Sequence, residues 1–125
     1  MNTKRDYHSC FVDKVTSSVY VIGGLDDKLN LLNSTEKWTF GQTLWQPFAN
    51  LPVAITDASA VSSNEKAFVG YMAGGGKEGY RDIYSNMIFG LRRRDMAWVK
   101  LSKWMNLGRE CHSLVNIPAK HILGC

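Results

Sequence analysis

The sequence has few of the residues that hold together small secreted or metal-binding folds. It contains three cysteines in 125 residues, Cys10, Cys111 and Cys125, and no Cys-x-x-Cys pair. An odd number of cysteines leaves one thiol unpaired, so a disulfide framework is not expected. Without a Cys-x-x-Cys pair, a zinc site is not expected either. Free, partly buried thiols are the simpler interpretation.

Long apolar runs are also missing. No stretch approaches the roughly 18 consecutive apolar residues that a membrane-spanning helix requires. Residues 1–10 are polar and lack the apolar centre of a secretory signal. With 45% hydrophobic and 21% charged residues, the chain fits one globular domain. We therefore expect a cytoplasmic protein that does not contact a membrane.

Acidic residues are scarce in the second half. Residues 1–62 carry five Lys/Arg and six Asp/Glu, whereas residues 63–125 carry ten and five. The surplus is centred on Arg92, Arg93 and Arg94. A basic half can attract nucleic acid or acidic peptides. However, three consecutive arginines are more typical of a solvated turn, so no nucleic-acid partner is expected.

Helical periodicity is hard to find. Apolar residues instead form short β-branched and aromatic runs, each bounded by turn residues such as Gly23-Gly24 or Gly74-Gly75. Many short strands at regular spacing predict an all-β fold. The expected strands cover residues 8–13, 18–23, 34–40 and 43–48, and then 57–62, 67–73, 84–91 and 96–101.

These strands belong to an internal repeat. The segment Ser18-Val-Tyr-Val-Ile-Gly-Gly24 matches Val69-Gly-Tyr-Met-Ala-Gly-Gly75 at an offset of 51 residues. An aromatic residue stands 14 residues after the glycine pair in both copies. A tryptophan stands 21 residues after the pair in the first copy and 23 residues after it in the second. The aromatic is Trp38 in one copy and Phe89 in the other, and the tryptophans are Trp45 and Trp98. We place the two extra residues of the second copy in the hairpin at Arg92–Arg94.

A third copy begins near the end of the chain. Arg5-Asp6-Tyr7-His8-Ser9 reappears as Arg109-Glu110-Cys111-His112-Ser113. The same spacing puts the start of the middle copy at Thr56, so that threonine replaces the arginine and Ser59 replaces the histidine. The chain therefore holds two copies and the beginning of a third.

This pattern resembles the kelch repeat, whose length of about 50 residues it shares. The resemblance covers residues 5 to about 121. It implies an all-β fold, a partial kelch β-propeller with two four-stranded antiparallel blades and the first strand of a third. The blades would occupy residues 5–53 and 54–107, with a third starting at 108–125.

The repeated residues are expected to be structural. Glycine pairs let two backbones approach closely, and aromatic side chains fill the space between neighbouring sheets. An aromatic cage for a ligand and a metal or catalytic role for the arginine–histidine pairs are the alternatives, but repetition favours packing. No metal, cofactor or enzymatic activity is expected. The structural set comprises Arg5, His8, Gly23, Gly24, Trp38, Trp45, Gly74, Gly75, Phe89, Trp98, Arg109 and His112.

Kelch propellers mostly bind proteins, so the resemblance implies a non-catalytic interaction module. It suggests the substrate-recognition part of a cullin-type ubiquitin ligase adaptor, with an actin-binding or scaffold protein as the alternative. Family members use the loop after each glycine pair and the start of each repeat for contact. Here these positions are Tyr7, Leu25, Asp26, Asp27, Lys28, Ala58, Lys77, Glu78, Tyr80, Arg81 and Cys111.

The loop residues carry both signs of charge, which predicts a partner surface of mixed charge. A propeller closes with about four to eight blades. Two blades and one strand cannot close, so we expect a piece of a longer kelch protein or a chain that associates with other blades or with itself. The isolated chain is expected to be marginally stable.

Overall fold

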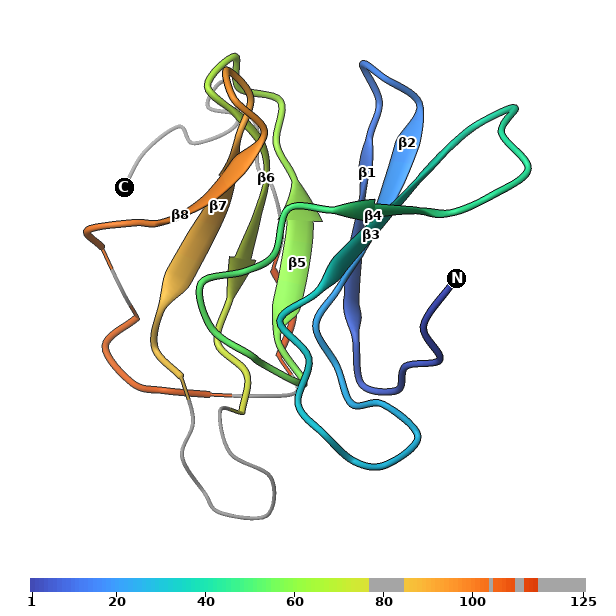
Figure 1. Cartoon of the computed structure of the whole chain (residues 1–125). Coiled ribbons are helices and arrows are strands. Elements are labelled where there is room, and N and C mark those ends of the chain that lie inside the picture. Colours follow the sequence, from blue (N-terminus) through green and yellow to red (C-terminus); the bar gives the residue numbers. More distant parts are fainter. Residues whose placement is uncertain (77–84, 104, 110–111, 115–125) are drawn as a thin grey trace.

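The computed structural model describes residues 1–76, 85–103, 105–109 and 112–114 (Figure 1). In these residues the chain forms two four-stranded antiparallel sheets and no helix, which confirms the expected all-β fold. Each sheet is built from strands consecutive in sequence. The first sheet contains β1 (Ser9–Asp13), β2 (Ser18–Ile22), β3 (Thr35–Thr39) and β4 (Gln46–Phe48). The second contains β5 (Ser59–Ser62), β6 (Phe68–Ala73), β7 (Ile88–Arg92) and β8 (Ala97–Lys100).

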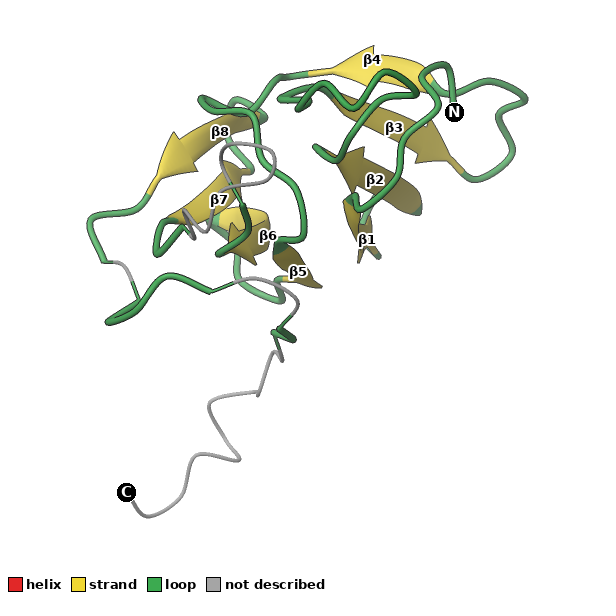
Figure 2. Cartoon of the chain, turned by 90° about the horizontal axis from the view of Figure 1, so that it is seen from below, coloured by secondary structure: helices red, strands yellow, loops and turns green. Residues whose placement is uncertain are grey.

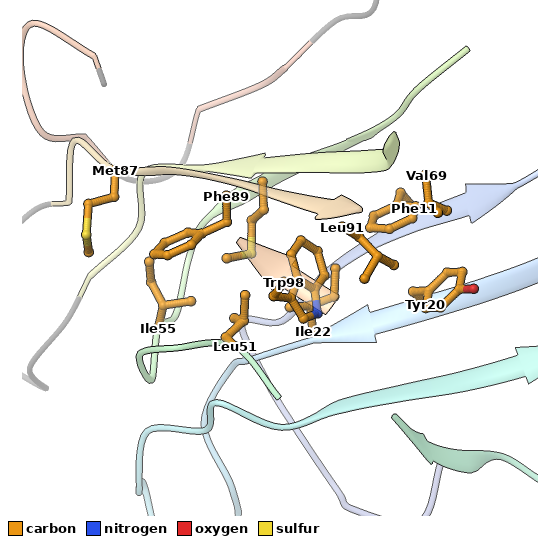
Figure 3. Packing of buried hydrophobic residues seen from close by; sticks show 11 residues of the cluster. Phe11, Tyr20, Ile22, Leu51, Ile55, Val69, Met87, Phe89, Leu91 and Trp98 are labelled. Atoms are coloured by element: carbon orange, nitrogen blue, oxygen red, sulfur yellow. The ribbon is translucent and has the colours of Figure 1, made fainter. Parts of the chain in front are cut away.

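The hydrophobic core lies between the two sheets. In β1 the residues alternate between buried and exposed, because successive side chains of a strand point to opposite faces. Phe11 of β1 stacks on Tyr20 of β2, with 5.1 Å between ring centroids, and meets the edge of Trp98 of β8 at 6.2 Å. Figure 3 shows these rings with their aliphatic neighbours. The buried cluster comprises Phe11, Tyr20, Ile22, Leu51, Ile55, Val69, Met72, Met87, Phe89, Leu91 and Trp98.

The sheets come closest along β1 and β5 (Figure 2). Gly70 of β6 makes this approach possible, since a Cβ there would lie only 2.8 Å from the ring of Phe11. Short polar side chains complete the contact. Ser9 Oγ donates a hydrogen bond to the carbonyl of Ala58 at 2.6 Å, and Ser62 Oγ donates to the carbonyl of Val12 at 2.7 Å.

A repeated set of backbone hydrogen bonds shows which residues of the two sheets are equivalent. The first glycine of each pair donates to the residue before the third strand, Gly23 to Ser34 and Gly74 to Met87. The second glycine donates to the segment that opens the next repeat, Gly24 to Ile55 and Gly75 to Arg109, each at 2.8 Å. Ile55 and Arg109 therefore occupy the same position.

The start of the middle repeat is one residue earlier than the sequence spacing indicated. Asp6 forms a bridge with Leu25, and the corresponding bridge joins Thr56 to Gly76. Thr56 thus corresponds to Asp6, and the counterpart of Arg5 is Ile55. The assignment of Thr56 to the arginine position was therefore wrong. It used the offset of 51 residues between the glycine pairs, whereas the segments that open the two repeats are offset by 50 residues, from Arg5 to Ile55.

The pairing of the third strands also corrects the sequence alignment. Glu36 stands opposite Val21, and Phe89 stands opposite the equivalent Met72. The two additional residues of the second copy therefore lie between β6 and β7, in the loop after the glycine pair, and not in the hairpin at Arg92–Arg94. By the same register, the counterpart of Trp38 is Leu91.

One buried position differs in chemistry between the sheets. In the first sheet Arg5 donates from Nη2 to Glu36 Oε1 at 2.9 Å, and the two side chains are 0% and 4% exposed. In the second sheet the equivalent residues are Ile55 and Phe89, which lie side by side in the core (Figure 3). A buried ion pair in one repeat is thus replaced by an apolar pair in the other.

Glu36 also fixes the chain terminus. Its carboxylate accepts hydrogen bonds from the backbone amides of Asn2 and Thr3 at 2.6 and 2.9 Å. Burial alone would raise the pKa of the Glu36 carboxyl, but these amides and the guanidinium of Arg5 hold that pKa below its ordinary value. Glu36 is therefore ionised in the fold, and it ties residues 2–5 to β3.

Candidate interaction surface

The loop that follows the first glycine pair, Gly76 after the second pair and the segments that open the first two repeats meet at one end of the two sheets, the lower end in Figure 1. We call the described part of this region the loop end and define it as residues 6–8, 25–31, 56–58 and 76. Its backbone is fixed by two bridges, one between Asp6 and Leu25 and one between Thr56 and Gly76, with N···O distances of 2.8–3.1 Å. The loop end is thus held rigidly on both sheets.

Tyr7 is the most prominent aromatic residue of the loop end. Its side chain is 56% exposed, and its backbone has a φ of 52°. The amide of Tyr7 donates to Asp6 Oδ1 at 2.8 Å, and its carbonyl accepts from the amide of Asp57 at 3.0 Å. Positive φ is unfavourable for a tyrosine, so these bonds maintain a conformation that projects the ring into solvent.

The loop after the first glycine pair is organised by Asp26. Its Oδ1 accepts from the amides of Lys28 and Asn30, each at 2.8 Å, and its Oδ2 accepts from Asn30 Nδ2 at 2.9 Å. The side chain and amide of Asn30 are the main reason that the pKa of the Asp26 carboxyl is lowered. Asp26 therefore shapes the turn, while Asp27 and Lys28 are exposed and free to meet a partner.

Leu29 was not among the predicted contact residues. It is 57% exposed and has a φ of 62°. The sequence did hold a signal for it, because Asp26 followed four residues later by Asn30 can close a turn through side-chain to backbone bonds and expose the residues between. The loop end thus offers an apolar side chain next to charges of both signs.

The remaining predicted contact residues differ in accessibility. Leu25 is half-buried and lines a shallow depression of about 220 Å³ together with Lys4, Asp6 and Asp27. Ala58 is partly buried and packs on the core. Lys77, Glu78, Tyr80, Arg81 and Cys111 lie outside the described residues.

The repeated histidines contact the glycine pairs. A side chain added at Gly74 would overlap His112, and one added at Gly24 would lie 3.1 Å from the Cβ of His8. This placement is that of packing residues. Within the described ranges, no three His, Cys, Asp or Glu side chains gather closely enough to hold a metal ion. In the same ranges, no helix has the length and apolarity needed to cross a membrane.

The predicted structural aromatics fall into two groups. Phe89 and Trp98 are 1% and 6% exposed and belong to the core between the sheets. Trp38 and Trp45 are only half-buried, and they pack against each other at 6.4 Å on the opposite face of the first sheet. There they lie outside the space between the two described sheets.

The opposite end of the molecule holds a cavity of about 320 Å³, lined by the turns after β1, β5 and β7. Its buried carboxylate, Asp13, pairs with Arg93 at 3.3 Å and accepts a hydrogen bond from Thr16 at 2.8 Å. Burial would raise the pKa of Asp13, but the bonds from Thr16, Arg93 and the amide of Val15 lower it overall. Asp13 and Arg93 therefore link the two sheets across this cavity.

Comparison with known proteins adds no assignment, since no protein-family model matches the chain and no curated protein matches its sequence. The function is therefore inferred from the repeat and from the geometry of the two sheets.

Proposed function

We propose that the chain is a non-catalytic protein-binding module of the kelch type, which presents its loop end to a partner. The observation that carries the proposal is the exposed ring of Tyr7, held at positive φ by hydrogen bonds on a backbone that spans both sheets. Binding residues are often found on loops that a rigid scaffold positions. Tyrosine is among the residues that contribute most to protein interfaces.

The charge of the loop end defines the partner further. Asp27 and Lys28 are exposed beside Leu29, so the surface combines an acid, a base and an apolar side chain within three positions. A purely acidic or purely basic ligand would meet repulsion from one of the two charges. The proposed partner is a protein surface of mixed charge with an apolar centre.

The resemblance to kelch repeats supports a narrower role. We propose the substrate-recognition part of a cullin-type ubiquitin ligase adaptor, acting in the cytoplasm. The loop after the second glycine pair is two residues longer than the first by strand register. The copies thus differ in the loop that the kelch resemblance assigns to partner contact.

The experiment compares two double variants in affinity capture from a cell extract, with quantitative mass spectrometry. The loop-end variant is Tyr7→Asn with Lys28→Ala, because asparagine adopts positive φ more readily than alanine. The control is Lys66→Ala with Arg94→Ala, at exposed turns of the opposite end.

We expect at least one partner to be lost by the loop-end variant and kept by the control. Binding of that purified partner should weaken on the order of tenfold or more, as expected for an interface hot spot. If the loop-end variant retains every partner, the proposed surface is wrong. Cullin-ligase components among the lost partners would support the adaptor role, whereas co-sedimentation with actin filaments would replace it with a scaffold role.

A further inference from the structure

The outer face of the first sheet is covered near Glu36 by residues 2–5, but beyond them it has an apolar part that no other described residues cover. A groove of about 370 Å³ on it is lined by Val12, Val19, Trp38 and Phe40, with Lys14 and Ser17 at its border. Phe40 is 78% exposed, and its ring lies 6.0 Å from that of Trp38. We call Val12, Val19, Trp38, Phe40 and Trp45 the Trp38 face. Contiguous exposed apolar surface of this kind marks an interaction site.

The second sheet shows what covers the equivalent face there. Leu91 and Trp98, the counterparts of Trp38 and Trp45 by strand register, are 0% and 6% exposed. They are buried against Phe11 and Tyr20 of the first sheet. The intramolecular contact therefore joins a tryptophan-bearing face of one sheet to a Phe–Tyr pair of another.

The complementary half of this contact recurs on the second sheet. Val61 is paired with Tyr71, as Phe11 is paired with Tyr20 in the first sheet. Phe68 packs on Tyr71 with 5.1 Å between ring centroids. We call Val61, Phe68 and Tyr71 the Tyr71 face, and all three side chains are half-buried. One molecule thus carries both halves of the contact on opposite outer faces.

We propose that the Trp38 face of one copy stacks on the Tyr71 face of a second copy, in the same order of faces as the contact that joins the two sheets within the chain. Val19 and Val61 take the places of Gly70 and Phe11 there, so a larger residue on one face is matched by a smaller one on the other. The faces differ from each other, so the association is head to tail. Such an interface gives a closed ring or an open chain of copies rather than a symmetric pair. The loop end remains accessible, so the proposal is independent of the proposed function.

The proposed interface lacks the ion pair of the intramolecular one. Asp13 and Arg93 link the two sheets, and their counterparts in the proposed contact are Ser63 and Phe40. Without a salt bridge across it, the association is expected to persist in high salt.

The test uses one substitution on each face. Phe40→Glu places a charge on the Trp38 face, and Val61→Glu places one on the Tyr71 face. Val15→Glu is the control, because Val15 is 79% exposed in the turn after β1 and belongs to neither face. Size-exclusion chromatography with light scattering measures the mass, and circular dichroism verifies that each variant is folded.

We expect the wild type and the control to self-associate as concentration rises, and each face variant alone to be monomeric. An equimolar mixture of the two face variants should form a 1:1 dimer, since each retains the face that the other has lost. A monomeric wild type would overturn the proposal. A mixture that stays monomeric would also overturn it. Self-association of Val61→Glu while Phe40→Glu is monomeric would overturn it as well, because the Trp38 face would then pair with itself. Association unaffected by either substitution would also overturn it.

Discussion

The ion pair between Arg5 and Glu36 allows a direct test of the equivalence between the two repeats. Replacing one partner leaves the other charge buried, with side chains only 0% and 4% exposed in the wild type. Breaking such a pair costs about 3–5 kcal/mol. We therefore expect Arg5→Ile and Glu36→Phe, each alone, to lower the free energy of unfolding by about that amount.

The double variant copies the apolar pair of the second sheet into the first. Ile55 and Phe89, the residues to be copied, are each 1% exposed, so the fold accommodates them at this position. Replacing a buried ion pair by apolar residues is often neutral or stabilising. Glu36→Phe also removes the acceptor of the Asn2 and Thr3 amides. We therefore expect the double variant to be somewhat less stable than the wild type but clearly more stable than the worse single variant. The two substitutions should thus be strongly non-additive.

Urea denaturation followed by tryptophan fluorescence and circular dichroism measures these changes. Asp95→Asn serves as the control, because its ion pair with Arg92 is exposed and should leave the unfolding midpoint nearly unchanged. A double variant as unstable as the worse single variant would refute the equivalence of these positions. Single variants as stable as wild type would refute the energetic role of the pair.

Three other predictions concern stability. The pKa of Asp13 is lowered in the fold, so the ionised carboxylate contributes fully to the free energy of unfolding above the ordinary pKa of 3.8, and this contribution is lost as the pH falls further. Urea midpoints measured against pH should show this loss, and Asp13→Asn should weaken the pH dependence. Gly24→Ala should lower the melting temperature more than Gly41→Ala, since both have positive φ but an added Cβ meets other atoms only at Gly24; equal shifts would contradict this. Phe11→Ala should cost about 3–5 kcal/mol in urea denaturation, whereas Val15→Ala, at an exposed turn, should change little.

The sequence predicted the eight strands well because apolar alternation and turn residues mark them locally. The expected range 18–23 corresponds to β2, Ser18–Ile22, and 67–73 corresponds to β6, Phe68–Ala73. The third strands were misaligned by two residues. The alignment matched Trp38 with Phe89 as aromatics, but the hydrogen-bond register matches Phe89 with Glu36. An exchange of a charged residue for an aromatic one conceals the equivalence from any comparison by residue type.

Burial of the repeated aromatics could not be predicted from a repeat alone. Trp45 and Trp98 occupy equivalent positions, but within the described residues a neighbouring sheet packs against the face of Trp98 and not against that of Trp45. Tertiary neighbours, rather than local sequence, decide this difference. For the loop end, the sequence predicted partner contact at Tyr7 and in the loop at residues 25–28, and this role stays a prediction; the structure shows Tyr7, Asp27 and Lys28 exposed. The sequence prediction missed Leu29, whose exposure follows from a turn closed by side-chain hydrogen bonds.

The bond from the Gly24 amide to the Ile55 carbonyl has a consequence for how the molecule opens. The donor belongs to the first sheet, whereas the acceptor belongs to the segment that leads into the second. Exchange of the Gly24 amide with solvent deuterium therefore requires a separation of the two units, not only a local fluctuation of β2. The Gly75 amide likewise donates a hydrogen bond to the carbonyl of Arg109, in the segment that opens the third repeat. Each glycine amide thus reports on the attachment of the next repeat, and the opening of one repeat is linked to that of its neighbour as in a one-dimensional array.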